Sequence, residues 1–302
     1  MYNSFQKYPL WKVDTVGTAY KKIVERDALY TKIYIVVIIV IGFCTGILYV
    51  IPTDEDHEMF FIMTWFEDNL LEWADILSLC HRCSFLFVSL LMQAPCFQIC
   101  YLLKHAEYQL GIIQKLLENI HYGFEDLDEM TCGDTKVQGE IRTRLLFCVK
   151  RHVSFIVIIK KHIREAGVFV FLFSVTGGMV AVSMLLFFFL NEENLTFNHF
   201  RFWALIVVAF LTGVQYVLQG QSLEDITVEF YETLTRIEWY YWNKENKIIY
   251  QILLINASDP VTVKFSENVS VNYKLGIDVG KAVYSMMSFM TYIRDSVLTR
   301  KG

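Results

Sequence analysis

The chain has 302 residues, of which 54% are hydrophobic, 16% aromatic and only 20% charged, and its net charge is −5. A soluble domain of this size carries more charge and fewer phenylalanines than the 24 found here, so the composition indicates a membrane protein. The weak acidic charge and the lack of a basic tract give no support for a nucleic-acid partner. The seven cysteines are odd in number and several lie in apolar stretches, which favours reduced packing residues. No ligand set at zinc spacing is present, so neither a metal nor another cofactor is expected.

Five segments are long and apolar enough to cross a bilayer. The first has 19 uncharged residues, which at about 1.5 Å per residue matches a hydrocarbon core about 30 Å thick. The last is the weakest, because Asp278 and Lys281 lie in its first half. The sequence therefore predicts an all-α, multi-span integral membrane helical bundle. Its predicted spans are residues 33–51, 83–103, 167–190, 202–218 and 275–293.

The distribution of lysine and arginine between the spans predicts the orientation. Residues 1–32 hold six of them, residues 104–166 ten and residues 219–274 five. The two other connections hold one each, Arg82 and Arg201, and the first of them, residues 52–82, contains eight acidic side chains. The N-terminus is therefore expected in the cytoplasm. Asn194, in an Asn-Leu-Thr sequon, falls in a loop assigned to the exterior and is a candidate for glycosylation.

The predicted cytoplasmic regions, 104–166 and 219–274, contain amphipathic helices that continue the spans. Their apolar stripes must be buried, either against one another or in a subunit interface. Between the two stripes, residues 123–139 read as a flexible acidic surface loop. The stripes comprise Leu103, Ala106, Leu110, Ile113, Leu117 and Ile120, and then Leu145, Val149, Val153, Ile156, Ile159 and Ile163.

The last span carries an unusual number of hydroxyl groups, on Tyr284, Ser285, Ser288 and Thr291. Each hydroxyl needs a partner inside a membrane, so a purely lipid-facing helix gains nothing from them. Two interpretations remain open from the residues alone. The helix either borders an aqueous pore or packs inside the bundle with its hydroxyls bonded to neighbouring helices.

Three stretches, in order, resemble the insect odorant receptor family, a group of seven-span proteins with a cytoplasmic N-terminus. Residues 145–167 resemble the helix that enters its fifth span, with Cys148 and His152 at typical places. Residues 216–242 resemble the end of its sixth span. Residues 248–285 resemble its closing stretch, which has a proline and a Lys-x-x-Tyr-Ser element, here Pro260, Lys281, Tyr284 and Ser285. The five spans correspond to the family's third to seventh, so the chain reads as an N-terminally short member whose first two spans would precede Met1.

This resemblance implies a function. Members of the family are ligand-gated, non-selective cation channels that assemble as hetero-tetramers with a shared olfactory co-receptor and respond to volatile small molecules. The chain is then expected in the cell membrane, on the dendrites of sensory neurons. The final span lines the pore in this family, which implies that Ser285, Phe289 and Ile293, one face of a helix, border the pore and that the last two close it by dewetting.

A ligand pocket is expected in the outer halves of the spans, with apolar walls and a few polar groups. The second span, which helps to line the pocket in the family, has no counterpart here. The candidate ligand-binding residues are Phe43, Ile47, Tyr49, Phe85, Val88, Met92, Trp203, Ile206 and Phe210.

The sequence argues against other classes of membrane protein. It has no HExxH, GxSxG or paired-histidine motif, so no enzymatic activity is expected. A G-protein-coupled receptor would place its N-terminus outside, against the basic residues of 1–32. Two alternatives stay open: a gustatory-receptor-like channel, which shares the architecture without the co-receptor, and a truncated receptor form that does not conduct.

Overall fold

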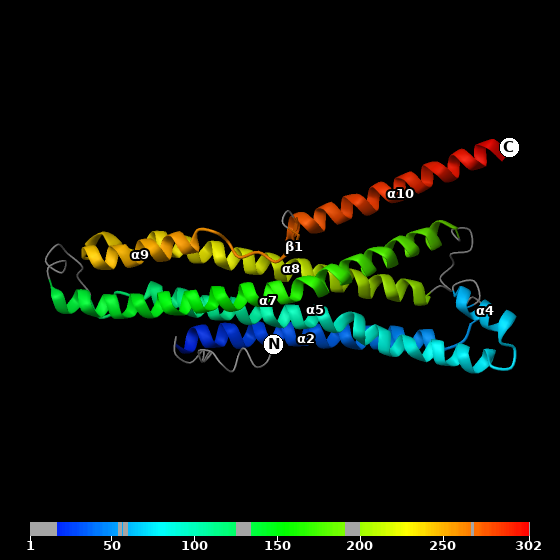
Figure 1. Ribbon diagram of the computed structural model, residues 1–302, viewed down its shortest axis with the longest axis horizontal. Coiled ribbons are helices and arrows are strands. Elements are labelled where there is room, and N and C mark those ends of the chain that lie inside the picture. The colour runs from blue at the N-terminus through cyan, green and yellow to red at the C-terminus, as the bar shows by residue number, and fades with distance from the viewer. Residues whose placement is uncertain are drawn as a thin grey trace. The chain divides into compact units, whose positions relative to one another are not determined.

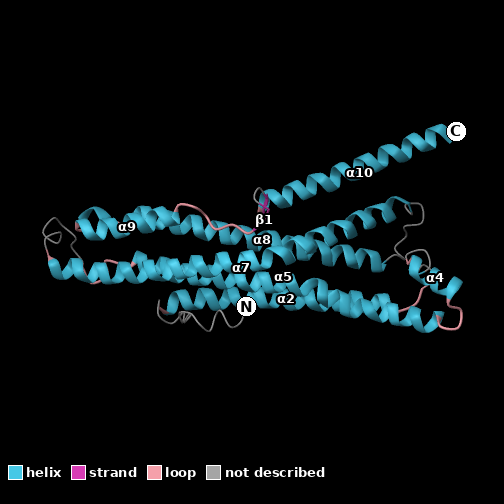
Figure 2. Cartoon of the chain, in the orientation of Figure 1, coloured by secondary structure: helices cyan, strands magenta, loops and turns pink. Residues whose placement is uncertain are grey.

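The computed structural model describes residues 17–53, 56, 60–124, 134–190, 200–266 and 269–301 (Figure 1). This part of the chain is mostly helical, with short connecting loops and one short antiparallel hairpin, in which Lys264 pairs with Ser270 (Figure 2). The predicted all-α fold class is therefore confirmed. The elements are α2 (Thr18–Val50), α4 (Phe61–Asn69), α5 (Ala74–Glu118), α7 (Thr135–Leu190), α8 (Phe200–Arg236), the 3₁₀ turn η3 (Trp239–Tyr241), α9 (Lys244–Ala257), β1 (Lys264–Ser266), β2 (Val269–Ser270) and α10 (Tyr273–Lys301).

Three of the described helices, α2, α5 and α8, are long and apolar enough to cross a membrane. They contain the segments expected at 33–51, 83–103 and 202–218, except that α2 ends one residue earlier, at Val50. The segments expected at 167–190 and 275–293 lie within α7 and α10. α5, α7 and α8 extend well beyond their predicted spans, because their amphipathic continuations prolong the same backbone hydrogen-bond ladder.

The structure corrects two expectations about the connections. The segment 52–82 is not simply a loop, since it contains α4 and the first nine residues of α5. The acidic segment 123–139 ends in helix, because α7 begins at Thr135. The Asp134 carboxylate accepts a 2.8 Å hydrogen bond from the backbone N–H of Lys136 and caps the first turn. Residues 125–133 of that segment lie outside the described part of the chain.

The chain divides into two compact units, and the long helices contribute to both. The first unit comprises Met1–Ala28, Ile99–Phe171 and Tyr216–Val279. The second comprises Leu29–Gln98, Leu172–Gln215 and Gly280–Gly302. The candidate ligand-binding and pore residues all belong to the second unit. The predicted amphipathic stripes belong entirely to the first.

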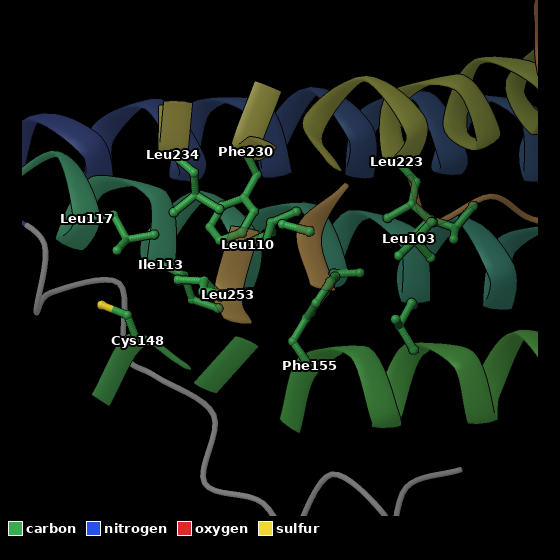
Figure 3. Packing of buried hydrophobic residues seen from close by; sticks show 14 of the residues in the cluster. Leu103, Leu110, Ile113, Leu117, Cys148, Phe155, Leu223, Phe230, Leu234 and Leu253 are labelled. Carbon is green, nitrogen blue, oxygen red and sulfur yellow. The ribbon is translucent and has the colours of Figure 1, made fainter. Parts of the chain in front are cut away.

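The first unit is built on one hydrophobic core (Figure 3). Leu110 and Leu117 of α5, Leu145 of α7, Phe230 of α8 and Leu253 of α9 are all almost fully buried in it. The two stripes therefore pack against each other and against α8 and α9 within one chain. Val153 is the exception, since about half of its surface is exposed.

A polar network ties three helices together in the first unit. The Asp27 carboxylate of α2 pairs with Lys104 at 3.0 Å and accepts a 2.7 Å hydrogen bond from the Tyr108 hydroxyl. Lys104 also pairs with Glu107, which accepts a 2.8 Å hydrogen bond from Ser222 of α8. The first turns of α2, which sequence reasoning did not assign to a helix, are thus anchored on α5 and α8.

The beginning of α10 is fastened to α8 in the same unit. A Cβ atom on Gly220 would lie 2.1 Å from the carbonyl oxygen of Val271, so only glycine permits this approach. The Gln221 side chain accepts a 3.1 Å hydrogen bond from the backbone of Tyr273, the first residue of α10. Asn272 caps the helix by accepting from the Leu275 N–H. Gly220 and Gln221, which lie in the stretch that resembles the end of the family's sixth span, therefore hold the start of the last helix.

Candidate ligand-binding and pore residues

Two glycines bring α2 and α5 close together in the second unit. A Cβ on Gly46 would lie 3.3 Å from the Phe85 carbonyl oxygen and from the Leu86 Cα. Gly42, one turn earlier, faces the side chain of Gln93, whose Nε2 atom would lie 1.7 Å from an added Cβ. Small residues four apart allow helices in a membrane to pack at short distance. This contact fixes the two helices that carry most of the candidate ligand-binding residues.

Gln93 has a buried amide with an unusual environment. Its side chain is only 4% exposed, and neither Nε2 nor Oε1 has a hydrogen-bond partner among the described residues. An unpaired buried amide is costly, by about 1–3 kcal/mol for each group left without a partner. The sequence signal was an amide side chain inside an apolar span, one of two there, but it did not indicate that Gln93 faces a glycine. Gln93 is therefore an additional candidate for contact with a polar group of a ligand.

Four aromatic rings cluster at the end of α2 and the beginning of α5. Tyr49 lies 5.2 Å from Phe85 and 6.2 Å from Phe60, measured between ring centroids. His81 lies 5.6 Å from Phe60 and 5.2 Å from Phe85, both edge to face. Such arrangements are favourable beyond the area they bury. Tyr49 and Phe85 are thus two predicted ligand-binding residues that the structure brings into contact.

A buried carboxylate lies in the same region. Asp56 has a side chain that is 1% exposed, and its Oδ1 accepts a 2.8 Å hydrogen bond from Arg201 of α8. Its Oδ2 lies 3.2 Å from the Nε of Arg82 of α5 and accepts a hydrogen bond from the Thr53 N–H, while the Thr53 hydroxyl donates to Oδ1. Arg201 also donates to the Ile51 carbonyl and lies 5.9 Å above the Tyr49 ring. Sequence reasoning missed this cluster.

The remaining candidates for the ligand site lie mostly on open surface. Phe85 and Ile206 are partly buried, and Tyr49 is buried. The other six keep more than a third of their surface exposed, up to 67% at Phe210. A pocket that encloses a ligand needs walls on all sides, so a site built on these side chains needs a further wall from outside the described chain. The six are Phe43, Ile47, Val88, Met92, Trp203 and Phe210.

The predicted pore residues lie on a helix with no buried residue between Tyr273 and Ile293. Ser285 is exposed, Phe289 is 60% exposed and Ile293 is 41% exposed. Apolar side chains are exposed on several sides of the helix, including Tyr284 and Tyr292. A helix of this kind requires lipid, other subunits or both around it, because its apolar surface is otherwise left in water.

One step of the sequence argument about this helix does not hold. The hydroxyls of Ser288 and Thr291 donate to the carbonyl oxygens of Tyr284 and Met287, each at 3.0 Å within α10 itself. These two hydroxyls are thus satisfied locally and do not by themselves require water or a neighbouring helix. The candidate glycosylation site, Asn194, lies outside the described residues.

The fold is similar to that of the insect olfactory receptor OR5 from Machilis hrabei. Its structure in complex with eugenol matches with a TM-score of 0.65 and 9% sequence identity, over 96% of this chain and 73% of that chain. A second structure of the same receptor matches with a TM-score of 0.62 at 9% identity, over 92% and 70%. The sequence matches no protein-family model and no curated protein. The chain therefore has the all-α, membrane-type fold of these olfactory receptor structures.

Proposed function

We propose that the chain is an odorant-receptor subunit of a ligand-gated, non-selective cation channel. The observation that carries the proposal is α10, which leaves apolar residues exposed on several sides and has no buried residue up to Ile293. A pore-lining helix faces water on one side and other helices or lipid on the others, which suits such a surface. The shared fold with insect olfactory receptor structures supports the same assignment.

The ligand is a volatile small molecule held by α2, α5 and α8 of the second unit. The open candidate residues, such as Phe43, Val88 and Phe210, support a site completed by a further helix. In the resembled family the second span has that role. Gln93 supplies a polar contact, since both its donor and its acceptor lack partners among the described residues. The Gln93 amide lies against Gly42 and is buried from solvent. A ligand therefore contacts it when the Gln93 side chain rotates away from α2.

Gating takes place through α10, at the face formed by Ser285, Phe289 and Ile293. Cysteines placed at Phe289 and Ile293 test this assignment, with Met287→Cys on the opposite face as the control. In ligand-opened complexes, a charged, water-soluble thiol reagent should block current through the first two variants and leave the control unchanged. Unreactive cysteines at both positions in conducting complexes would remove α10 from the pore.

Assembly involves an olfactory co-receptor in a hetero-tetramer. Ile248, Ile252 and Ile255 form an exposed row on α9, and exposed isoleucines at helical spacing are typical of a surface that another protein covers. Ligand-evoked cation currents are expected only when the chain is expressed with the co-receptor. Currents without the co-receptor would instead favour a gustatory-receptor-like channel. No current in either case, from protein at the cell surface, would favour a form that does not conduct.

The chain is proposed to lie in the cell membrane, in the dendrites of sensory neurons, with its N-terminus in the cytoplasm and its C-terminus outside. Epitope tags at the two ends test the orientation in intact cells, where only the C-terminal tag should bind antibody.

Glycosylation at Asn194 is part of the same proposal. An Asn194→Gln variant should then lose the shift in gel mobility that a glycosidase removes from the unmodified chain.

A further inference from the structure

The short helix α4 presents an apolar face that nothing in the described chain covers. Phe61 and Trp65 lie one turn apart and are 79% and 43% exposed, and Ile62 lies beside them and is also exposed. Met63 points into the protein and is fully buried, so the helix is held in place on one side. Glu67 lies one turn after Met63, opposite Trp65, and is exposed in the last turn of the helix. The exposed apolar side chains of α4 are thus held in a folded position, and its acidic side chains lie at its C-terminal end.

The apolar face does not end with α4. Leu71, Trp73, Ile76 and Leu79 are also exposed, and they lead along the chain from α4 into the first turns of α5. From there α5 continues into the apolar segment that is long enough to cross a membrane. The exposed face of α4 is therefore continuous in sequence with a surface that meets lipid.

The position of α4 places it near the membrane surface. It connects α2, which ends at Val50, to α5, which begins at Ala74, and both are apolar enough to span a bilayer (Figure 1). Tryptophan and phenylalanine are favoured at the boundary between headgroups and acyl chains, where an amphipathic helix buries its apolar face to a depth of about 5–10 Å.

We infer that α4 is an interfacial membrane helix, with Phe61, Ile62 and Trp65 inserted among the lipids of the outer leaflet and Glu67 turned to water. The occupant of this face is the bilayer rather than another protein, since the face adjoins a lipid-facing helix and has carboxylates beside it. Exposed Glu72 and Asp75 flank its continuation, and such charges stay in the aqueous layer. The inference requires that α2 and α5 cross the membrane, and the choice of the outer leaflet rests on the proposed orientation; it is independent of ligand, co-receptor or conduction.

The test uses the full chain in phosphatidylcholine nanodiscs that hold one copy each. A small fluorophore is attached to a Trp65→Cys variant and, as the matched control, to a Glu67→Cys variant, in a chain whose other accessible cysteines are serine. Brominated lipids should quench the label at position 65 and leave the label at position 67 unaffected. Iodide in the water should quench the label at position 67 and spare the one at position 65.

Two results would overturn the inference. If iodide quenches both labels equally, the face lies in water. If neither quencher reaches position 65, another part of the protein covers it. Both substituted residues are exposed, so the variants should keep the melting temperature of the unmodified chain, and a Trp65→Cys variant that does not is replaced by Phe61→Cys at the same face. Loss of ligand response with an unchanged quenching pattern would contradict the proposed function alone.

Discussion

The guanidinium of Arg201 donates a 2.8 Å hydrogen bond to the carboxylate of Asp56, which precedes it by 145 residues. Arg82 approaches the same carboxylate from α5 at 3.2 Å. Arg82 and Arg201 are the only lysine or arginine residues in the two connections that contain them, 52–82 and 191–201. The two arginines that enter the count for the orientation are thus also the two cations that pair with buried Asp56, and through it they link α5 to α8.

Replacing Asp56 with asparagine should destabilise the protein strongly. The amide keeps the size of the side chain but leaves two guanidinium groups, 17% and 11% exposed, without their counter-charge. Removing one partner of a buried ion pair costs about 3–5 kcal/mol, so the melting temperature in detergent should fall clearly. Asp68→Asn, at an exposed acid of α4, is the control and should change little. An equal effect of the two substitutions would mean that the Asp56 charge contributes nothing to stability.

A second prediction concerns the close contact of α2 with α5. Gly46→Leu should push the helices apart, because even a Cβ at this position meets backbone atoms of α5 at 3.3 Å. Overpacking of this kind costs about 1–3 kcal/mol. Gly213→Leu, in α8 of the same unit, is the matched control, since nothing lies within 4 Å of its added Cβ. Thermal unfolding of both variants checks the prediction, which fails if Gly46→Leu is as stable as the control.

The amphipathic stripes were predictable because helical periodicity is a local property of the sequence. Leu103, Leu110 and Leu117 recur at seven-residue intervals, and all three are buried in the first unit. Periodicity alone left open whether a second subunit covers the stripes, and the structure shows that α8 and α9 do so. Periodicity also included Val153 in the second stripe, although its side chain is exposed. Its position relative to α8 and α9 depends on tertiary packing, which no local pattern encodes.

The polar contacts of the second unit could not be predicted in the same way. Asp56 was one of eight acids in its segment, and nothing nearby in the sequence distinguishes the one that two arginines bind. The pairing of Gln93 with Gly42 depends on the rotation of two helices about their axes, which is set by tertiary packing. For the same reason the sequence named Tyr49 and Phe85 as candidate ligand-binding residues but did not predict that their rings cluster with Phe60 and His81.

The core of the first unit should lose stability in acid through His152. Its ring is 3% exposed and stacks on Phe230, with 4.9 Å between centroids and 9° between planes. Burial lowers the pKa of His152 from 6.5 to about 4. Between these two pH values the unfolded chain therefore binds a proton at His152, whereas the folded chain does not. The contribution of His152 to the free energy of unfolding is therefore fully present above about pH 6.5. It falls by about 3 kcal/mol as the pH drops toward 4.

His152→Phe isolates this effect, because phenylalanine keeps a ring on Phe230 and cannot be protonated. The difference in melting temperature between variant and unmodified chain should grow in favour of the variant as the pH falls from 7 to about 4.5. Other groups that titrate in this range act on both chains and cancel in the difference. Parallel pH profiles for the two chains would show that His152 accepts a proton without cost in the folded state.

Gln93 should distinguish ligands by their hydrogen-bonding groups. Its amide has an unpaired donor and an unpaired acceptor among the described residues, and a hydroxyl group satisfies both, whereas a ketone oxygen satisfies only the donor. In channels formed with the co-receptor, Gln93→Leu should weaken the response to an alcohol more than to the ketone of the same skeleton. One lost hydrogen bond of about 1 kcal/mol corresponds to a roughly fivefold rise in the half-maximal concentration. Gln98→Leu, at an exposed glutamine of α5, should affect both ligands alike. Equal losses for alcohol and ketone in the Gln93 variant would show that the amide packs against Gly42 and does not contact the ligand.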